Sequence, residues 1–118
     1  MADTEMREPT FFILASLVSG RKHGYAMIQD VAELSGGRVH LKVATLYTAL
    51  DRLGKQELVA TAGEEVVDGR LRRYYTVTES GSEALELELQ RIEANARQVR
   101  SRLLLRPVSL RAASGAIA

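Results

Sequence analysis

The period of the apolar residues changes at Leu58 in this chain of 118 residues, and that change constrains the fold more than any other feature. Before Leu58 the apolar positions recur with the spacing of helices, whereas after it they alternate as in strands. Asp68-Gly69 follows and is the strongest short signal for a hairpin turn in the sequence. The sequence therefore predicts helices followed by a two-stranded ribbon.

A two-residue turn at Asp68-Gly69 fixes the register of the ribbon. This register places small residues opposite large ones near the base and opposite charges across from each other near the tip. Each such charge pair contributes about 0.2 to 1 kcal/mol to the pairing of strands. The predicted partners are Ala60 with Val77, Ala62 with Tyr75, Glu64 with Arg73, and Glu65 with Arg72.

Three stretches ahead of the ribbon have helical periodicity. The first begins near Pro9, a residue type suited to the first turn of a helix, and ends at residues 19–20. A loop at residues 21–24 separates it from a second helix at residues 25–34. The third helix is predicted at residues 43–57, although no residue type that favours an N-cap stands at its start.

A fourth helical pattern runs from Thr78, a suitable N-cap, to Pro107. Its apolar residues are spaced 4, 3, 4, 3 and 4 apart, which is the heptad repeat of a coiled coil. A helix of this extent is about 40 Å long and exceeds the width of a small domain, so much of the apolar row needs a partner outside its own core. We therefore expect a homodimer that forms through Leu85, Leu89, Ile92, Ala96, Val99 and Leu103.

Composition limits the function without selecting one. The net charge is only +1, so nucleic-acid binding would depend on the local placement of charge. Cysteine is absent and there are only two histidines, so we expect neither a cysteine-based nor a histidine-rich metal site. We find no catalytic motif, and the apolar run near the start is too short to span a membrane. We expect a single-domain cytoplasmic protein that is not an enzyme, has no cofactor or metal, and does not bind membranes.

The third helix has an apolar face at Val43, Leu46, Tyr47, Leu50 and Leu53. Its opposite face carries small residues, hydroxyls and cations, with Asp51 as the nearest carboxylate. A solvated helix surface is the ordinary interpretation of such residues. The residues concerned are Ala44, Thr45, Thr48, Arg52 and Lys55.

Three helices followed by a ribbon is the order of a winged helix-turn-helix domain, in which the third helix enters a DNA groove. Three motifs in this sequence resemble the PadR family of bacterial transcriptional regulators: HGYAMIQDV in the second helix, TLYTALDRL in the third, and RRYYTVTESGSEAL from the last strand into the last helix. Together they cover most of residues 10–85. The chain differs at Val43-Ala44 and Thr48, where the family often has Pro-Gly and Pro. The single last helix is similar to the smaller branch of the family, whose members dimerise through it.

The pattern and the resemblance together predict a mainly α fold with a small two-stranded β wing. A winged helix-turn-helix domain is expected at residues 9–78, a dimerisation helix at 79–106 and a disordered tail at 107–118. On this plan Arg52 can bind guanine through two hydrogen bonds, and Tyr47 can bury its ring while its hydroxyl reaches a phosphate. The predicted DNA-binding residues are Lys42, Thr45, Tyr47, Thr48, Arg52, Lys55, Arg70, Arg72 and Arg73, and Arg38 is a further candidate for a phosphate contact.

Two of the wing arginines have alternative interpretations. Arg72 and Arg73 either pair with Glu65 and Glu64 across the ribbon or contact phosphates. Arg70 lies beside the turn and has no acidic partner in the predicted register, so it is the first choice for a wing contact.

The predicted function is that of a DNA-binding transcriptional regulator, a repressor that binds an inverted repeat in double-stranded DNA as a homodimer. The resemblance implies a small-molecule effector that acts between the winged domain and the dimerisation helix. Two alternatives stay open. One is a winged-helix module that binds another protein, and the other is an architectural DNA-binding protein with no effector.

Overall fold

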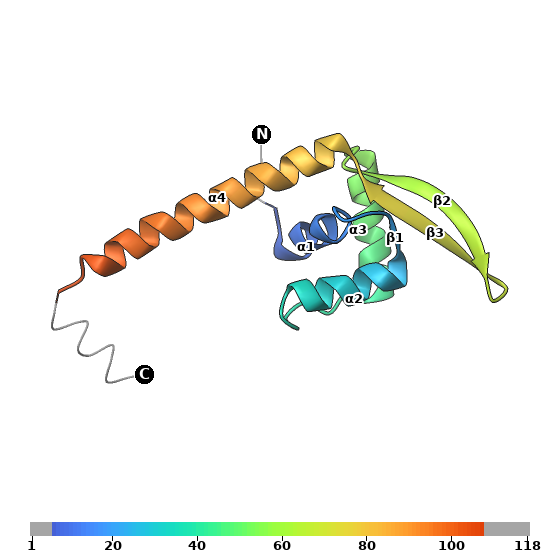
Figure 1. Cartoon of the computed structure of the whole chain (residues 1–118), viewed down its shortest axis with the longest axis horizontal. Helices are drawn as coiled ribbons and strands as arrows, with labels where there is room; N and C mark the ends of the chain where they lie inside the picture. The colour runs from blue at the N-terminus through green and yellow to red at the C-terminus, as the bar shows by residue number, and fades with distance from the viewer. Residues whose placement is uncertain (1–5, 108–118) are drawn as a thin grey trace. The chain divides into compact units, whose positions relative to one another are not determined.

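The computed structural model describes residues 6–107, and in this part of the chain it contains four helices and one three-stranded antiparallel sheet (Figure 1). Apart from Pro107, the tail expected at residues 107–118 lies outside the described residues. None of the helices within the described range is both long and apolar enough to cross a membrane. The elements are α1 (Glu8–Ser16), β1 (Lys22–His23), α2 (Gly24–Leu34), α3 (Val43–Lys55), β2 (Val59–Val67), β3 (Arg70–Val77) and α4 (Glu79–Leu104).

The chain divides into two compact units, one ending at Glu88 and the other beginning at Leu89. The boundary lies within α4, so the first turns of this helix belong to the same unit as α1–α3 and the sheet. Leu85, in those first turns, packs at the edge of the core of that unit.

The core of the first unit is formed by the apolar faces of α1, α2 and α3 together with the base of the sheet. Leu46, Leu50 and Leu53 of α3 are buried, as their helical spacing predicts. Val43 of the same predicted face is instead 61% exposed, because it is the first residue of α3 and lies about one turn ahead of the buried Leu46. The other buried apolar residues are Ile13, Leu14, Leu17, Met27, Val31, Ala49, Val59 and Tyr75.

Residues 21–24, expected to form a loop, include the short strand β1. It pairs with β3, placing Lys22 opposite Tyr75 and His23 opposite Tyr74, so the sheet has the order β1-β3-β2. The predicted two-stranded wing is present as β2 and β3, and β1 is an additional strand that the sequence did not reveal, because a strand of two residues has no alternation that a pattern could show. The His23 side chain also begins α2, since its Nδ1 accepts the Ala26 N–H at 3.4 Å.

The β2–β3 hairpin is called the wing below. Its tip has the predicted register. Glu64 lies opposite Arg73 and Glu65 opposite Arg72. The turn between the strands has positive φ at both central residues, 51° at Asp68 and 76° at Gly69, as a type I′ turn requires. The aspartate-glycine signal therefore identified both the turn and the pairing near it.

The base of the wing differs from the predicted register by one residue. Tyr75 pairs with Thr61 instead of Ala62, and the same shift continues toward the core. The cause is a β-bulge between Thr61 and Glu64, where Gly63 has a φ of 101°. The extra residue in β2 changes which side chains of this strand face the core at the base of the wing.

Thr78 is the N-cap of α4, as predicted. Its Oγ1 accepts the Gly81 N–H at 3.0 Å and donates to the Glu57 carbonyl at 2.7 Å, and its N–H donates to the Leu58 carbonyl. Gly81 itself allows a close approach, because a Cβ at this position would collide with the Leu58 carbonyl oxygen. These contacts attach the first turn of α4 to the segment between α3 and β2.

Candidate nucleic-acid interface

The outer face of α3 is exposed along its whole length. Thr45, Thr48, Arg52 and Lys55 all lie on solvent-accessible surface, and Lys42 is exposed as the N-cap residue. No side chain caps the start of α3, which agrees with the absence of a capping residue in the sequence. The predicted α3 contacts therefore share one surface.

The two cations near the end of this helix have different partners. Lys55 Nζ lies 3.3 Å from Asp51 Oδ2, one turn away, but both side chains are more than two-thirds exposed, so the pair contributes little to stability. Arg52 Nη2 instead donates to Thr10 Oγ1 at 2.9 Å and thereby joins α3 to the start of α1. Of the two cations, only Arg52 is directed toward another element.

Tyr47 lies between the core and the surface. Its ring meets the Tyr75 ring edge-to-face with centroids 6.4 Å apart, and the residue is 42% exposed. Its hydroxyl lies against the start of α2, where Gly24 has no side chain to displace it. The ring thus contacts the base of the sheet, while the phosphate contact expected of the hydroxyl stays a prediction.

The wing arginines have different partners. Arg73 Nε donates to Glu64 Oε2 at 3.1 Å, which is the predicted cross-strand pair. Glu65 lies opposite Arg72 but accepts a hydrogen bond from the Tyr74 hydroxyl at 2.8 Å. Within residues 6–107 no carboxylate forms an ion pair with Arg70 or Arg72, so these two guanidinium groups remain available.

A cluster that the sequence did not reveal holds the wing against β1. The Arg21 guanidinium lies 4.2 Å from the centre of the Tyr74 ring, donates to the Ala62 carbonyl at 2.8 Å, and reaches Glu65 at 3.8 Å. The contact with the ring is a cation–π interaction. Because Arg21 lies 41 residues before Ala62, only the pairing of β1 with β3 brings them together.

His23 lies beside this cluster, with its ring 5.6 Å from the ring of Tyr74. Burial lowers the pKa of His23, and the positive charge of Arg72 lowers it further, while Glu65 acts in the opposite direction. The lowered pKa favours the neutral imidazole, whose Nδ1 can accept the Ala26 N–H at the start of α2. His23 is therefore a structural residue of the α2 cap.

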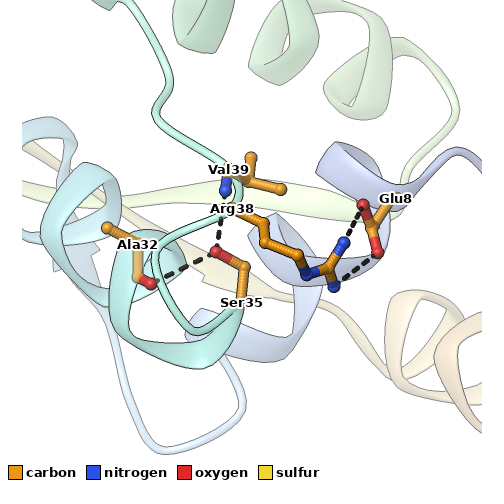
Figure 2. A network of polar contacts seen from close by, with 5 residues as sticks. All are labelled: Glu8, Ala32, Ser35, Arg38 and Val39. Atoms are coloured by element: carbon orange, nitrogen blue, oxygen red, sulfur yellow. Dashed lines mark hydrogen bonds and ion pairs between the residues drawn. The ribbon is translucent and has the colours of Figure 1, made fainter. Parts of the chain in front are cut away.

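Arg38 is held by an acidic partner in α1. Its guanidinium forms two hydrogen bonds with the Glu8 carboxylate, at 3.1 and 2.8 Å, as Figure 2 shows. These bonds lower the pKa of the Glu8 carboxyl below its ordinary value of 4.5. In the same segment, Ser35 Oγ accepts the Val39 N–H at 2.9 Å and donates to the Ala32 carbonyl. Arg38, a candidate for phosphate contact, thus links the α2–α3 loop to the first turn of α1.

Two grooves flank the outer face of α3. The wing groove, of about 760 Å³, lies between the start of α2, Tyr47 and the wing, and it contains Arg70, Arg72 and Arg73. The α1–α3 groove, of about 390 Å³, lies on the other side of the helix. Its lining residues are Arg7, Pro9, Thr10, Ala44, Thr45, Thr48, Ala49 and Arg52.

The residues predicted to mediate dimerisation do not share one environment. Leu85 is half-buried at the edge of the core of the first unit. Leu89, Ile92, Val99 and Leu103 are 38%, 41%, 60% and 48% exposed, and Ala96 is also exposed. The apolar row is thus uncovered from Leu89 onward.

The geometry defines the class of protein. Three helices with an exposed third helix, followed by a hairpin that extends beyond them, form the winged helix-turn-helix fold (Figure 1). Residues 13–87 match the transcriptional regulator PadR-like family, and the chain belongs to this family. Its members are transcriptional regulators rather than enzymes, and no group of histidine, aspartate and glutamate residues in the described part of the chain could hold a metal ion.

Individual relatives agree with this assignment. The chain is 36% identical over 87 residues to the transcriptional regulator Rv3488 of Mycobacterium tuberculosis, a match that covers 74% of this chain and 78% of that protein. It is 32% identical over 69 residues to an uncharacterized protein of Lysinibacillus sphaericus, covering 58% of this chain and 63% of the length of that relative.

Solved structures show the same fold. A transcriptional regulator from Clostridium thermocellum has a TM-score of 0.66 and 24% identity, with 79% of this chain and 87% of that chain covered. PadR of Bacillus subtilis, solved in complex with operator DNA, has a TM-score of 0.62 and 24% identity, with 70% and 47% covered.

Proposed function

We propose that this regulator is a repressor that acts in the cytoplasm, where it binds an inverted-repeat operator in double-stranded DNA as a homodimer and dissociates when a small-molecule effector binds. The observation that carries the proposal is the outer face of α3. It presents hydroxyls and cations between two grooves that contain further arginines.

The chemistry of this surface matches that of DNA. Thr45 and Thr48 can approach base edges closely because their side chains are short, while Arg70 and Arg72 at the wing have charges that no carboxylate in the described residues neutralises. Tyr47 adds a hydroxyl at the border of the wing groove. Lys42 and Lys55, at the two ends of α3, are candidates for phosphate contacts.

The dimer is supported by the exposed apolar row on α4. Leu89, Ile92, Ala96, Val99 and Leu103 continue a heptad spacing on one side of the helix. An exposed apolar row of this length favours association with another chain. In a twofold dimer the same residues of the partner chain would cover it. The two copies of α3 in such a dimer, related by a twofold axis, require two inverted half-sites in the DNA.

The effector part of the proposal is supported by a groove of about 920 Å³ between α3, the sheet and the start of α4. Its volume falls in the range of small-molecule sites. Tyr47, Tyr75 and Leu50 supply apolar surface, and Asp51 and Lys55 supply charge. A ligand in this groove would contact α3 directly.

One observation favours the alternative of a protein-binding module. Val66 and Leu71 form a cross-strand pair near the tip of the wing and are 71% and 61% exposed. A protein partner could cover this pair. Binding of such a partner would depend less on salt than binding to DNA, because fewer counterions are released.

The deciding experiment is a binding titration with DNA from the region upstream of the gene for this protein, beside a duplex of random sequence. Repressor function predicts tighter binding to the upstream DNA, a steep fall of log affinity with log salt, and a footprint with two inverted half-sites. A single asymmetric half-site at saturation would exclude the dimeric geometry. Failure to bind either duplex would favour the protein-binding module.

A further inference from the structure

The α1–α3 groove has the composition of an anion site. Its lining contains two arginines, Arg7 and Arg52, and three threonines, Thr10, Thr45 and Thr48, but no carboxylate. Guanidinium groups present several N–H donors in one plane, and hydroxyls add further donors, so this set matches the oxygens of a phosphate group. None of the predicted wing contacts lies in this groove.

The carboxylates nearest in sequence to the groove are already engaged. Both oxygens of Glu8, next to Arg7, accept hydrogen bonds from Arg38. Asp51, next to Arg52, pairs with Lys55. Within the described residues no carboxylate forms an ion pair with Arg7 or Arg52, so among these residues nothing neutralises the positive charge of the groove.

Arg52 is also held in place at this groove. The 2.9 Å bond from its Nη2 to Thr10 Oγ1 uses one of the five N–H donors of the guanidinium and leaves the others for a ligand. The hydroxyls of Thr45 and Thr48 line the same groove from α3. The ligand would thus be held between α1 and α3.

We propose that the α1–α3 groove binds one phosphodiester of the DNA backbone, with Arg7 and Arg52 as its charged ligands. The inference rests on the proposed DNA binding and extends the interface from α3 to the start of α1. It assigns Arg52 to the DNA backbone instead of to guanine. Sequence preference then comes from other residues on α3.

The test measures how affinity depends on salt for the wild type and for variants that lack these charges. Arg7→Gln, Arg52→Gln and the double variant keep a polar side chain of similar length, and Arg97→Gln removes the same charge from the second unit as a control. Each protein is titrated with the upstream duplex and with a duplex of random sequence at several salt concentrations. Circular dichroism verifies that every variant is folded.

The double variant should lower the slope of log affinity against log salt by about 1.8, because the dimer loses one phosphate contact of about 0.9 in each of its two protomers. It should weaken both duplexes alike, and Arg97→Gln should keep the wild-type slope. An unchanged slope in the double variant, with a wild type that binds DNA, overturns this inference and leaves the proposed function standing. A loss of about 3.6 overturns the single-phosphate site, since it corresponds to two phosphates in each protomer of the dimer. A wild type that binds neither duplex overturns both proposals.

Discussion

Replacing Gly24 with alanine tests the contact between the start of α2 and Tyr47. A Cβ at this position would lie 2.5 Å from Tyr47 Oη and 3.1 Å from Tyr47 Cζ, with Leu46 Cδ2 at 3.4 Å. The first distance is too short for non-bonded carbon and oxygen, so either the phenol ring or the start of α2 must move. Overpacking of this kind costs about 1 to 3 kcal/mol, and the higher helix propensity of alanine offsets at most about 1 kcal/mol of that cost. We therefore expect Gly24→Ala to lower the free energy of unfolding by about 1 kcal/mol.

A double-mutant cycle with Tyr47→Phe separates this contact from other effects of the alanine. Phenylalanine lacks the Oη atom, so the nearest remaining contact is the one with Cζ, which a shift of a few tenths of an ångström relieves. In the phenylalanine background Gly24→Ala should cost little, giving a coupling free energy of about 1 kcal/mol. Gly54→Ala is the matched control, because a Cβ at this position in α3 meets nothing within 4 Å. That substitution should stabilise the protein by up to about 1 kcal/mol.

Urea unfolding followed by circular dichroism, at one fixed protein concentration because a dimer makes stability depend on concentration, supplies the four free energies. The reasoning fails if Gly24→Ala is equally costly with tyrosine and with phenylalanine at position 47. It also fails if Gly24→Ala stabilises the chain as Gly54→Ala does. Either result would mean that the hydroxyl of Tyr47 does not occupy the space beside Gly24.

Three further outcomes are expected. Val99→Glu should convert the dimer to a monomer, because burying two like charges at a twofold contact costs several kcal/mol. Sedimentation equilibrium at micromolar concentration measures this, and a variant that remains a dimer would contradict the prediction. Arg70→Ala should lower the salt slope of DNA binding by about 1.8, which is one phosphate contact for each wing of the dimer. Arg73→Ala should lower it less because Glu64 already engages Arg73, and equal slopes for the two variants would argue against this distinction. Arg38 lowers the pKa of the Glu8 carboxyl below 4.5, so the contribution of this pair is present above that pH and is lost as the pH falls through the lowered pKa. The difference in unfolding free energy between wild type and Glu8→Gln should accordingly shrink below pH 4.5, and a difference that stays constant with pH would show that the pair does not stabilise the fold.

The parts of the fold that follow from local rules could be predicted from the sequence. Leu46, Leu50 and Leu53 are buried because helical spacing places them on one side of α3, whatever surrounds it. The turn at Asp68-Gly69 depends only on residues that tolerate positive φ. Thr78 caps α4 through a bond to a residue three positions away.

The candidate site depends on contacts between distant residues, and these could not be predicted. Arg38 was a candidate for phosphate contact because the sequence around it shows no acidic partner. Its partner Glu8 lies 30 residues earlier in the chain. Arg52 reaches Thr10 across 42 residues, so no local pattern reveals the direction of its guanidinium. Side-chain type indicated which residues could carry charge to a ligand, but only the packing of α1 shows which of them are already engaged.

The β-bulge at Gly63 separates two demands on the wing. Side chains alternate between the faces of a strand, so one added residue shifts the phase of that alternation between base and tip. At the base the phase is fixed by the core, where Val59 and Tyr75 must point inward. At the tip the phase is set from the turn, so substitutions around Arg70 and Arg72 need not disturb those buried residues. The recognition properties of the tip can therefore diverge between related regulators while the domain that carries it keeps the same interior.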